Sequence, residues 1–261
     1  MSEVLILGTV ALDTIQTPFG KAENALGGSA SYASFSASFF TQPSIVSVIG
    51  KDFPEEYLDL LKDRKINLDN IKIEDKTFRW SGSYEFDMNE AKTHSTELNS
   101  LATFKPEVNE ELKNARYIFL ANIDPDIQNS IIEQVKNPQL IVMDTMNFWI
   151  DSKKEPLLNV IKKVDVFILN EGEARQLFDT PNLVTAANKA LELGPKTVII
   201  KKGEHGAIMF MDNKHFNAPG FPLETVKDPT GAGDTFGGAI TGYLAKTKDH
   251  SEQNFRKAIV Y

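Results

Sequence analysis

The sequence predicts a three-layer α/β/α domain, in which helices cover both faces of a doubly wound, mostly parallel β-sheet and a small β-sheet lid stands beside it. Three observations lead to this fold class. Short apolar runs rich in β-branched residues recur along the chain, segments of helical period separate them, and two polar segments interrupt the alternation. Alternation of strands and helices is typical of right-handed βαβ units.

The strands expected in the large sheet are apolar runs that lack polar alternation, as strands covered on both faces do. Ligands of such sheets gather at the carboxyl ends of the strands. Small or polar residues lie at or just past these ends, namely Gly8, Gly50, Asn122, Asp144 and Asn170. The runs are 4–8, 44–50, 117–121, 140–144, 166–170 and 197–201.

Helices are expected where apolar residues recur with helical period between these runs. The chain ends within such a pattern, at Tyr261, without a cap or a polar tail, so the sequence predicts that part of the fold lies beyond residue 261. The helical segments are 54–64, 127–136, 155–164, 172–178, 185–194, 234–245 and 251–261.

The two interrupting segments, about 14–26 and 76–97, are rich in threonine and aromatic residues and contain turn signals, which predicts antiparallel strands. They are too short for a second core. We therefore expect one domain over 1–261, with these strands as a lid that excludes water. An exposed lid sheet could also supply a homodimer interface. Arg79 in the lid either neutralises a phosphate or remains solvated.

Composition limits the classes of partner. The net charge is −8, the isoelectric point is near 5.1, and no Lys/Arg run occurs, which argues against nucleic acid or an anionic membrane and favours a small molecule. Cysteine is absent, so disulfides, thiolate nucleophiles and zinc–cysteine sites are excluded. Glu3 stands where a signal peptide needs basic residues, and no run of about 18 apolar residues follows. A cytoplasmic protein is expected.

The stretch DPTGAGDTFGGAI, residues 228–240, carries the clearest chemical signal. Gly231, Ala232 and Gly233 leave backbone N–H groups unobstructed at the start of a helix, whose positive dipole end attracts an anion such as phosphate. Asp234, in the first turn, can act as a general base beside that anion. The alternative is an Asp that caps its own helix.

This stretch is similar to the C-terminal signature of the ribokinase-like (PfkB) family of carbohydrate and purine kinases, usually Asp-Thr-Thr-Gly-Ala-Gly-Asp, with Pro229 as a departure. Three further motifs occur in family order. GGSASYASFSASFF (27–40) with SVIGKDF resembles the N-terminal signature, NEGE (170–173) the family's Asn-x-x-Glu, and KKGEHGA (201–207) its Lys-x-Gly-x-x-Gly turn.

The resemblance implies a ribokinase-like fold and an ATP-dependent kinase that transfers the γ-phosphate to a hydroxymethyl group of a small sugar. Asp234 would be the catalytic base, and the N–H groups of Gly231, Ala232 and Gly233 would hold the phosphate. ATP and Mg²⁺ are the implied cofactors, and the resemblance leaves K⁺ open, because Asp228 matches a position that helps bind a monovalent cation in many members. A turn-forming Asp before Pro229 is the alternative.

Further nucleotide contacts are implied by the resemblance. Glu173 would orient water bound to Mg²⁺, although Asn170 and Glu173 also form the pattern of a capping box. The glycines of the 201–207 turn would allow close approach of the backbone, and a plain hairpin turn is the alternative. The implied nucleotide-binding residues are Asn170, Lys201, Gly203, Gly206 and Thr230.

Substrate contacts follow from the same resemblance. Asp13 matches the position that binds substrate hydroxyls, with a surface turn as the alternative. Gly27 and Gly28 would let the chain pass close to the sugar, and Asn122, at a strand end, would also reach the substrate. Ribokinases have Asn where this chain has Ala11 and Tyr32, which weakens the case for free ribose. Tyr32 could stack on a ring, or pack in the core.

Two alternatives to a sugar kinase remain at this point. A nucleoside kinase of the adenosine type is the nearer one. A non-catalytic ligand sensor on the same fold is the other, although Asp234 and the glycine stretch are intact. A dinucleotide-binding dehydrogenase is rejected, because LILGTVALD has one glycine where Gly-x-Gly-x-x-Gly is required.

Overall fold

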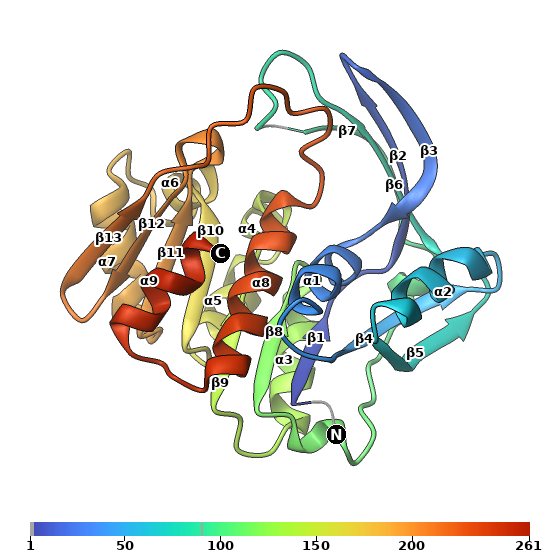
Figure 1. Ribbon diagram of the computed structural model, residues 1–261, viewed down its shortest axis with the longest axis horizontal. Helices are drawn as coiled ribbons and strands as arrows, with labels where there is room; N and C mark the ends of the chain where they lie inside the picture. Colours follow the sequence, from blue (N-terminus) through green and yellow to red (C-terminus); the bar gives the residue numbers. More distant parts are fainter. Residues whose placement is uncertain (1–2, 90) are drawn as a thin grey trace.

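The computed structural model describes residues 3–89 and 91–261, and within them the strands form a nine-stranded sheet and a four-stranded sheet (Figure 1). The large sheet has the order β13-β12-β11-β10-β9-β8-β1-β4-β5. Its neighbours are parallel except for the pairs β11–β12 and β12–β13. The predicted mostly parallel sheet is therefore confirmed. Its strands are β1 Val4–Leu7, β4 Pro43–Gly50, β5 Asn67–Glu74, β8 Tyr117–Leu120, β9 Leu140–Met143, β10 Val166–Asn170, β11 Thr197–Lys201, β12 Ala207–Met211 and β13 Lys214–Ala218.

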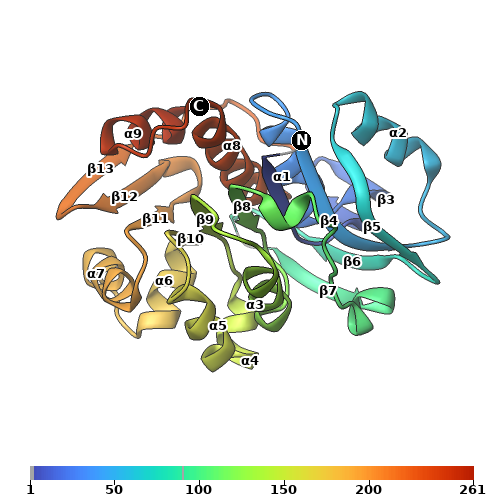
Figure 2. The same cartoon turned by 90° about the horizontal axis from the view of Figure 1, so that it is seen from below.

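Helices cover both faces of this sheet, as Figure 2 shows from below. One face carries α1 Ser29–Ala37, α2 Glu55–Asp63, α8 Ala232–Thr247 and α9 Glu252–Val260. The other carries α3 Pro125–Gln134, α4 Asn147–Ser152, α5 Lys154–Ile161, α6 Glu171–Phe178 and α7 Leu183–Leu193. Short 3-10 helices are η1 Asn99–Thr103, η2 Leu112–Asn114 and η3 Gly203–His205.

The core consists of two apolar layers, one on each face of the large sheet. Alternate residues of β1 enter different layers: Val4 and Ile6 pack with α1 and α8, whereas Leu5 and Leu7 pack with α3 and α5. All four side chains are fully buried. A strand covered on both faces has no polar side. This is why the apolar runs located the strands of the sheet centre.

The small sheet, the lid, has the order β3-β2-β6-β7, with β2 Ala11–Thr17, β3 Gly20–Gly27, β6 Phe78–Ser83 and β7 Lys92–Glu97. The pairs β2–β3 and β6–β7 are antiparallel, as predicted, but β2 and β6 are parallel, so the prediction of an antiparallel lid was wrong for the central pair. The strand β2 follows β1 in the chain, and β6 follows β5. Because β1 and β5 run in the same direction in the large sheet, β2 and β6 enter the lid in the same direction. Part of the predicted segment 76–97, residue 90, lies outside the described residues.

The lid stands beyond the edge of the large sheet where the parallel strands end, and the chain that leads into α8 passes on the same side (Figure 1). That edge is where ligands of parallel sheets bind. No helix among the described residues is long and apolar enough to cross a bilayer.

Candidate active site

The glycine stretch forms the start of α8. Gly231 has φ 75°, a left-handed conformation that favours glycine, and its Cα lies against the ring of Tyr32, where a Cβ would clash. The Ala232 N–H donates to the carbonyl of Pro229 at 3.1 Å. The N–H groups of Gly231 and Gly233 have no acceptor within the described part of the chain. Two of the three amides assigned to the anion site are therefore free, at the positive end of a helix dipole.

Asp234 is partly buried in the first turn of α8. Loss of hydration raises the pKa of its carboxyl to about 7, and the nearby charge of Asp144 acts in the same direction while Lys201 opposes it. A carboxyl with such a pKa is ionised in part at neutral pH and is basic enough to accept a proton from an alcohol in a transition state.

Asp13 lies on β2 and is 4% exposed. Burial raises the pKa of its carboxyl to about 7, a hydrogen bond from the Gly28 N–H opposes this, and Asp228 adds to the rise. One carboxyl oxygen, Oδ1, is buried without any hydrogen-bond partner among the described residues. Gly27 lies directly against this carboxyl, so that any Cβ there would collide with it. A buried acceptor without a partner costs free energy unless a ligand supplies a donor.

Tyr32 and Tyr84 border the same place. Burial, followed by the charges of nearby carboxyl groups that include Asp13, Asp228 and Asp234, raises the pKa of the Tyr32 hydroxyl. Burial and the same carboxyl groups also raise the pKa of Tyr84, and its hydroxyl lies 3.4 Å from the Thr230 Oγ1. Tyr84 follows β6 of the lid. The lid thus reaches the glycine loop across 146 residues of sequence.

Lys201, at the end of β11, forms a buried ion pair with Asp144, at the end of β9 (Nζ to Oδ2, 2.7 Å). Burial disfavours the ammonium charge, but Asp144 and Glu173 outweigh burial and raise the pKa of Lys201. Gly233 lies next to this ammonium, because a Cβ added at Gly233 would be 2.8 Å from the Lys201 Nζ. A permanent positive charge therefore lies below the free amides.

Asn170 and Glu173 form a complete capping box at the start of α6. The Asn170 Oδ1 accepts from the Glu173 N–H at 2.8 Å, and the Glu173 Oε2 accepts from the Asn170 N–H at 2.6 Å. Burial raises the pKa of Glu173 to about 7, Lys201 lowers it, and Asp144 raises it. The capping alternative is thus present in the structure. The role of Glu173 toward Mg²⁺ stays a prediction.

Asp228 is exposed, and its Oδ1 accepts from the Thr230 N–H at 2.9 Å, which is the turn offered as the alternative to a cation ligand. The turn between β11 and β12 contains Gly203 (φ 55°) and Gly206 (φ 88°), and its strands are antiparallel, so it is a hairpin turn. The lid residue Asn89 donates to Glu204 in this turn at 2.8 Å.

Asn122 is held in place by neighbours. Its Oδ1 accepts from the Trp149 Nε1 at 2.9 Å, and its Nδ2 lies 3.1 Å from the Met146 Sδ. The carbonyl oxygen therefore already has a donor, whereas the amide N–H groups have only a weak sulfur acceptor. Arg79, for which phosphate contact and solvation were both left open, contacts Asp52 and Asn24 with its guanidinium.

Sequence reasoning singled out Asp13, Tyr32, Lys201 and Asp234, and the structure brings these residues to one edge of the sheet. No role was predicted from the sequence for Tyr84 or for Asp52. Tyr84 was hidden in a segment read only as lid strands, and its contact with Thr230 comes from the tertiary fold. The aromatic residues Tyr84 and Phe86, which precede the predicted turn around Asn89, are the sequence signal that could have pointed to Tyr84.

Comparisons with known proteins identify the family of this chain. The model of the pfkB family of carbohydrate kinases matches residues 7–258. The cytidine kinase of Thermococcus kodakarensis is 26% identical over 251 residues, which cover 93% of this chain and 89% of that protein. The nucleoside kinase of Methanocaldococcus jannaschii is 24% identical over 211 residues, 77% of this chain and 66% of that protein.

Solved structures show the same fold. A protein of E. coli provisionally named ribokinase II, solved with ATP and Mg²⁺, superposes with a TM-score of 0.80 at 20% identity and covers 99% of this chain and 90% of that one. The crystal structure of the Methanocaldococcus jannaschii nucleoside kinase gives a TM-score of 0.77 at 20% identity, with 98% and 88% covered. Because the family model spans almost the whole chain and named relatives are kinases, this protein belongs to the pfkB family of carbohydrate kinases and is a phosphotransferase that acts on sugars or nucleosides.

Proposed function

We propose that the protein transfers the γ-phosphoryl group of ATP to the hydroxymethyl group of a ribosyl-type acceptor, with Asp234 as the general base. The observation that carries this proposal is the arrangement at the start of α8: a carboxyl with a pKa of about 7 beside two amides without acceptors, above the ammonium of Lys201. Base and anion site are thus within one helical turn.

In the proposed step the Asp234 carboxylate accepts the proton of the acceptor hydroxyl. The alcohol oxygen forms a bond to the γ-phosphorus, the bond from that phosphorus to the β–γ bridging oxygen breaks, and ADP leaves. The N–H groups of Gly231 and Gly233 hold the transferring oxygens, and the Lys201 charge below them stabilises the negative charge of the transition state. No covalent enzyme intermediate is required.

Asp13 would orient the acceptor. Its unpartnered Oδ1 can accept hydrogen bonds from vicinal hydroxyls, and charge-assisted bonds of this kind are stronger than neutral ones. Burial raises the pKa of this carboxyl to about 7, and hydrogen bonds donated by a bound diol would favour its ionised form. The acceptor is therefore expected to carry a cis-diol as well as the reacting hydroxymethyl group.

A nucleoside is the acceptor that the site favours, and a small sugar is the second candidate. The aromatic rings of Tyr32 and Tyr84 beside Asp13 offer surfaces for a base, and the chain lacks an amide at the buried Ala11. The similarity to the cytidine kinase of Thermococcus kodakarensis supports the same choice.

ATP and Mg²⁺ fit the residues present. The free amides and Lys201 suit phosphate oxygens, while no group of three or more His, Asp or Glu among the described residues is arranged to hold a metal ion directly. Mg²⁺ would therefore be held mainly by phosphate oxygens and water, with Glu173 the carboxyl available to that water, and it would neutralise phosphate charge. Activation by K⁺ near Asp228 is part of the proposal.

The test is ADP release from Mg-ATP with cytidine, adenosine, inosine, ribose and fructose, each with and without K⁺. We expect turnover with at least one nucleoside. Asp234→Asn should lower kcat by about 10²–10⁴-fold while ATP still binds, because only the base is lost. Asp212→Asn, an exposed acid in the β12–β13 turn, is the matched control. Ligand binding without turnover in the unaltered protein would favour the sensor.

A further inference from the structure

Asp52 follows the end of β4 and binds the root of the lid. Its Oδ1 accepts from the backbone N–H and from the Oγ1 of Thr77, both at 2.8 Å. Thr77 is fully buried, and its Oγ1 accepts in turn from the Gly50 N–H at 2.9 Å. The residue before β6 is thus tied to the end of β4 by three hydrogen bonds.

The second oxygen of Asp52 reaches further into the lid. Its Oδ2 lies 3.0 Å from the Arg79 NH2, and the Arg79 NH1 donates to the Asn24 Oδ1. Arg79 belongs to β6 and Asn24 to β3, on opposite sides of β2 in the order β3-β2-β6-β7. We call Asp52, Thr77, Arg79 and Asn24 the lid-root cluster. It spans the strand that carries Asp13.

Asn24 lies at an irregularity of β3 next to Asp13. The β2–β3 register shifts between Asp13 and Ile15, and Asn24 has φ 50°. Its carbonyl oxygen also accepts from the Tyr57 hydroxyl of α2 at 3.1 Å. This bulge is therefore held from two sides, by Arg79 and by α2.

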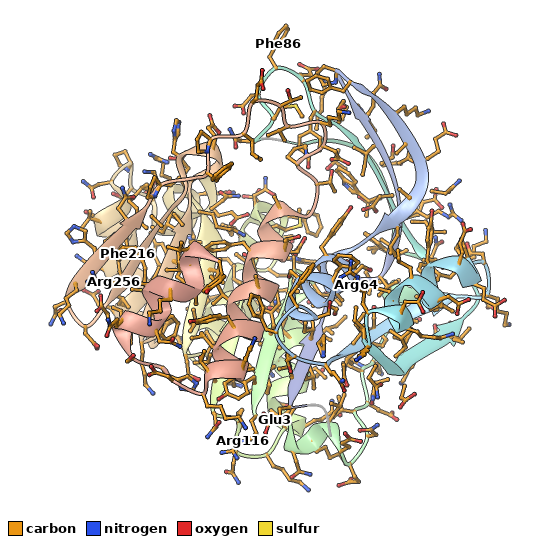
Figure 3. The ribbon with its side chains drawn as sticks, viewed as in Figure 1. Glu3, Arg64, Phe86, Arg116, Phe216 and Arg256 are labelled. Carbon is orange, nitrogen blue, oxygen red and sulfur yellow. The ribbon has the colours of Figure 1, made fainter. Side chains whose placement is uncertain are left out.

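The helix α2 is itself fixed to the large domain. Arg64, which follows α2 and is labelled in Figure 3, contacts two aromatic rings. Its guanidinium lies 4.3 Å from the ring centroid of Phe35 in α1 and 5.1 Å from that of Phe39, just after α1. Cation–π contacts of this kind hold the two helices together. The lid-root cluster thus joins the lid to a rigid part of the fold.

We propose that Asp52 is a positioning residue for the acceptor. Through Arg79 and Asn24 it fixes the strands on both sides of β2, and thereby the place of the Asp13 carboxyl relative to Asp234. Asp13 is opposite Ala25 of β3 and Trp80 of β6, so a shift of either strand moves it. The proposal rests on the proposed function, because it assigns Asp13 to acceptor binding.

The contacts should matter energetically. The side chains of Asp52 and Arg79 are 32% and 33% exposed, so solvent screens this ion pair less than a fully exposed one. Hydrogen bonds from Thr77 and Arg79 outweigh burial and hold the pKa of Asp52 below its ordinary value. Loss of one such charge-assisted contact is therefore expected to change KM for the acceptor by about tenfold.

The experiment compares Asp52→Asn with Asp75→Asn. The first keeps an oxygen for Thr77 but removes the charge that Arg79 contacts. The second removes an acid that forms an exposed ion pair with Lys51 at 3.2 Å, away from the lid. We expect Asp52→Asn to raise KM for the acceptor about tenfold, with KM for ATP changed less than about twofold. Asp75→Asn should change neither.

A second readout does not depend on turnover. Hydrogen exchange of backbone amides in β3 and β6 should be about tenfold faster in Asp52→Asn than in the unaltered protein or Asp75→Asn. Arg79→Lys, which keeps the charge but cannot contact Asp52 and Asn24 together, should give intermediate values. Unchanged exchange in both strands, or an equal rise of both KM values, would overturn the proposal. If Asp52→Asn shows the expected faster exchange but the unaltered protein has no turnover with any acceptor, the result would instead count against the proposed function.

Discussion

At the scale of the residue, burial governs the carboxyl groups near the start of α8. The pKa values of Asp13, Glu173 and Asp234 are each raised to about 7, with loss of hydration as the largest cause. Of these, Glu173 uses Oε2 in the α6 capping box, whereas the Asp13 Oδ1 has no hydrogen-bond partner among the described residues. The same physical effect thus acts on a carboxyl that caps a helix and on the two carboxyls proposed to act on the acceptor.

The pKa of Asp234 predicts the pH dependence of kcat. A general base must be ionised, so kcat should rise about tenfold between pH 6 and pH 8, around a midpoint near 7. The rise of kcat/KM with pH should be steeper than that of kcat, because Asp13 titrates in the same range in the free protein. Initial rates with saturating acceptor would measure this. A midpoint near 4 would contradict a raised pKa of the base during turnover.

At the scale of the element, the close packing of α1 against α8 holds the glycine loop over the sheet. Gly238 and Gly242 of α8 lie against Ala33 and Ala37 of α1, and a Cβ at Gly242 would come within 2.9 Å of the Ala37 Cα. Small residues at such a crossing let two helix backbones approach. The apolar and small pattern of this segment is therefore a packing surface.

Replacement of Gly238 tests this packing. In a free helix Gly→Ala stabilises by about 0.5–1 kcal/mol, but here the added Cβ would meet the backbone of Ala33. We expect Gly238→Ala to lower the free energy of unfolding by about 1–3 kcal/mol, as overpacking does. Chemical denaturation measures this. Gly172→Ala in α6, where the Cβ would meet only the Asn170 side chain, should change it by less than about 1 kcal/mol. Equal effects would argue against the helix contact as the cause.

The strands were predicted correctly where both of their faces are buried, because burial on both faces requires an uninterrupted apolar run. The apolar runs coincide with β1, β4, β8, β9, β10 and β11 to within a residue or so at each end. The edge strands β5 and β13, and β12 next to β13, were not anticipated. The residues of β5 are mostly only partly buried, and those of β13 are largely exposed, so polar side chains interrupt the apolar signal.

At the scale of the whole molecule, the site lies between the large sheet and the lid. Tyr84 reaches Thr230, and Asn89 reaches Glu204, so the lid contacts both the glycine loop and the β11–β12 turn. At the far end of the lid Phe86 points away from the rest of the molecule and is fully exposed (Figure 3). A role of the lid in a homodimer stays a proposal.

Stability should be lower at high pH because of the buried carboxyl of Asp13. Its pKa is raised in the folded protein, so the folded state keeps a proton that the unfolded state releases between about pH 4 and pH 7. The contribution of this group to stability therefore falls as pH rises through that range. Asp13→Asn should raise Tm by about 5 °C at pH 8 and hardly at pH 4.

Thermal unfolding at both pH values measures this, with Asp212→Asn as the exposed control. Acceptor binding should be lost in Asp13→Asn in the same samples. A variant that loses stability at pH 8 would show that the Asp13 carboxylate is satisfied in the folded protein by contacts not involving a ligand.

The sequence by itself determined the layers, the strands of the sheet centre and the segments that carry Asp13, Lys201 and Asp234, because burial on both faces and glycine at a helix start leave local patterns. Only the tertiary structure decided that Lys201 pairs with Asp144, that Tyr84 meets Thr230 and that Asp52 binds Arg79. These contacts join residues far apart in the chain. Which partner a charged or hydroxyl group finds depends on how the lid and the sheet are packed, and no local pattern records that.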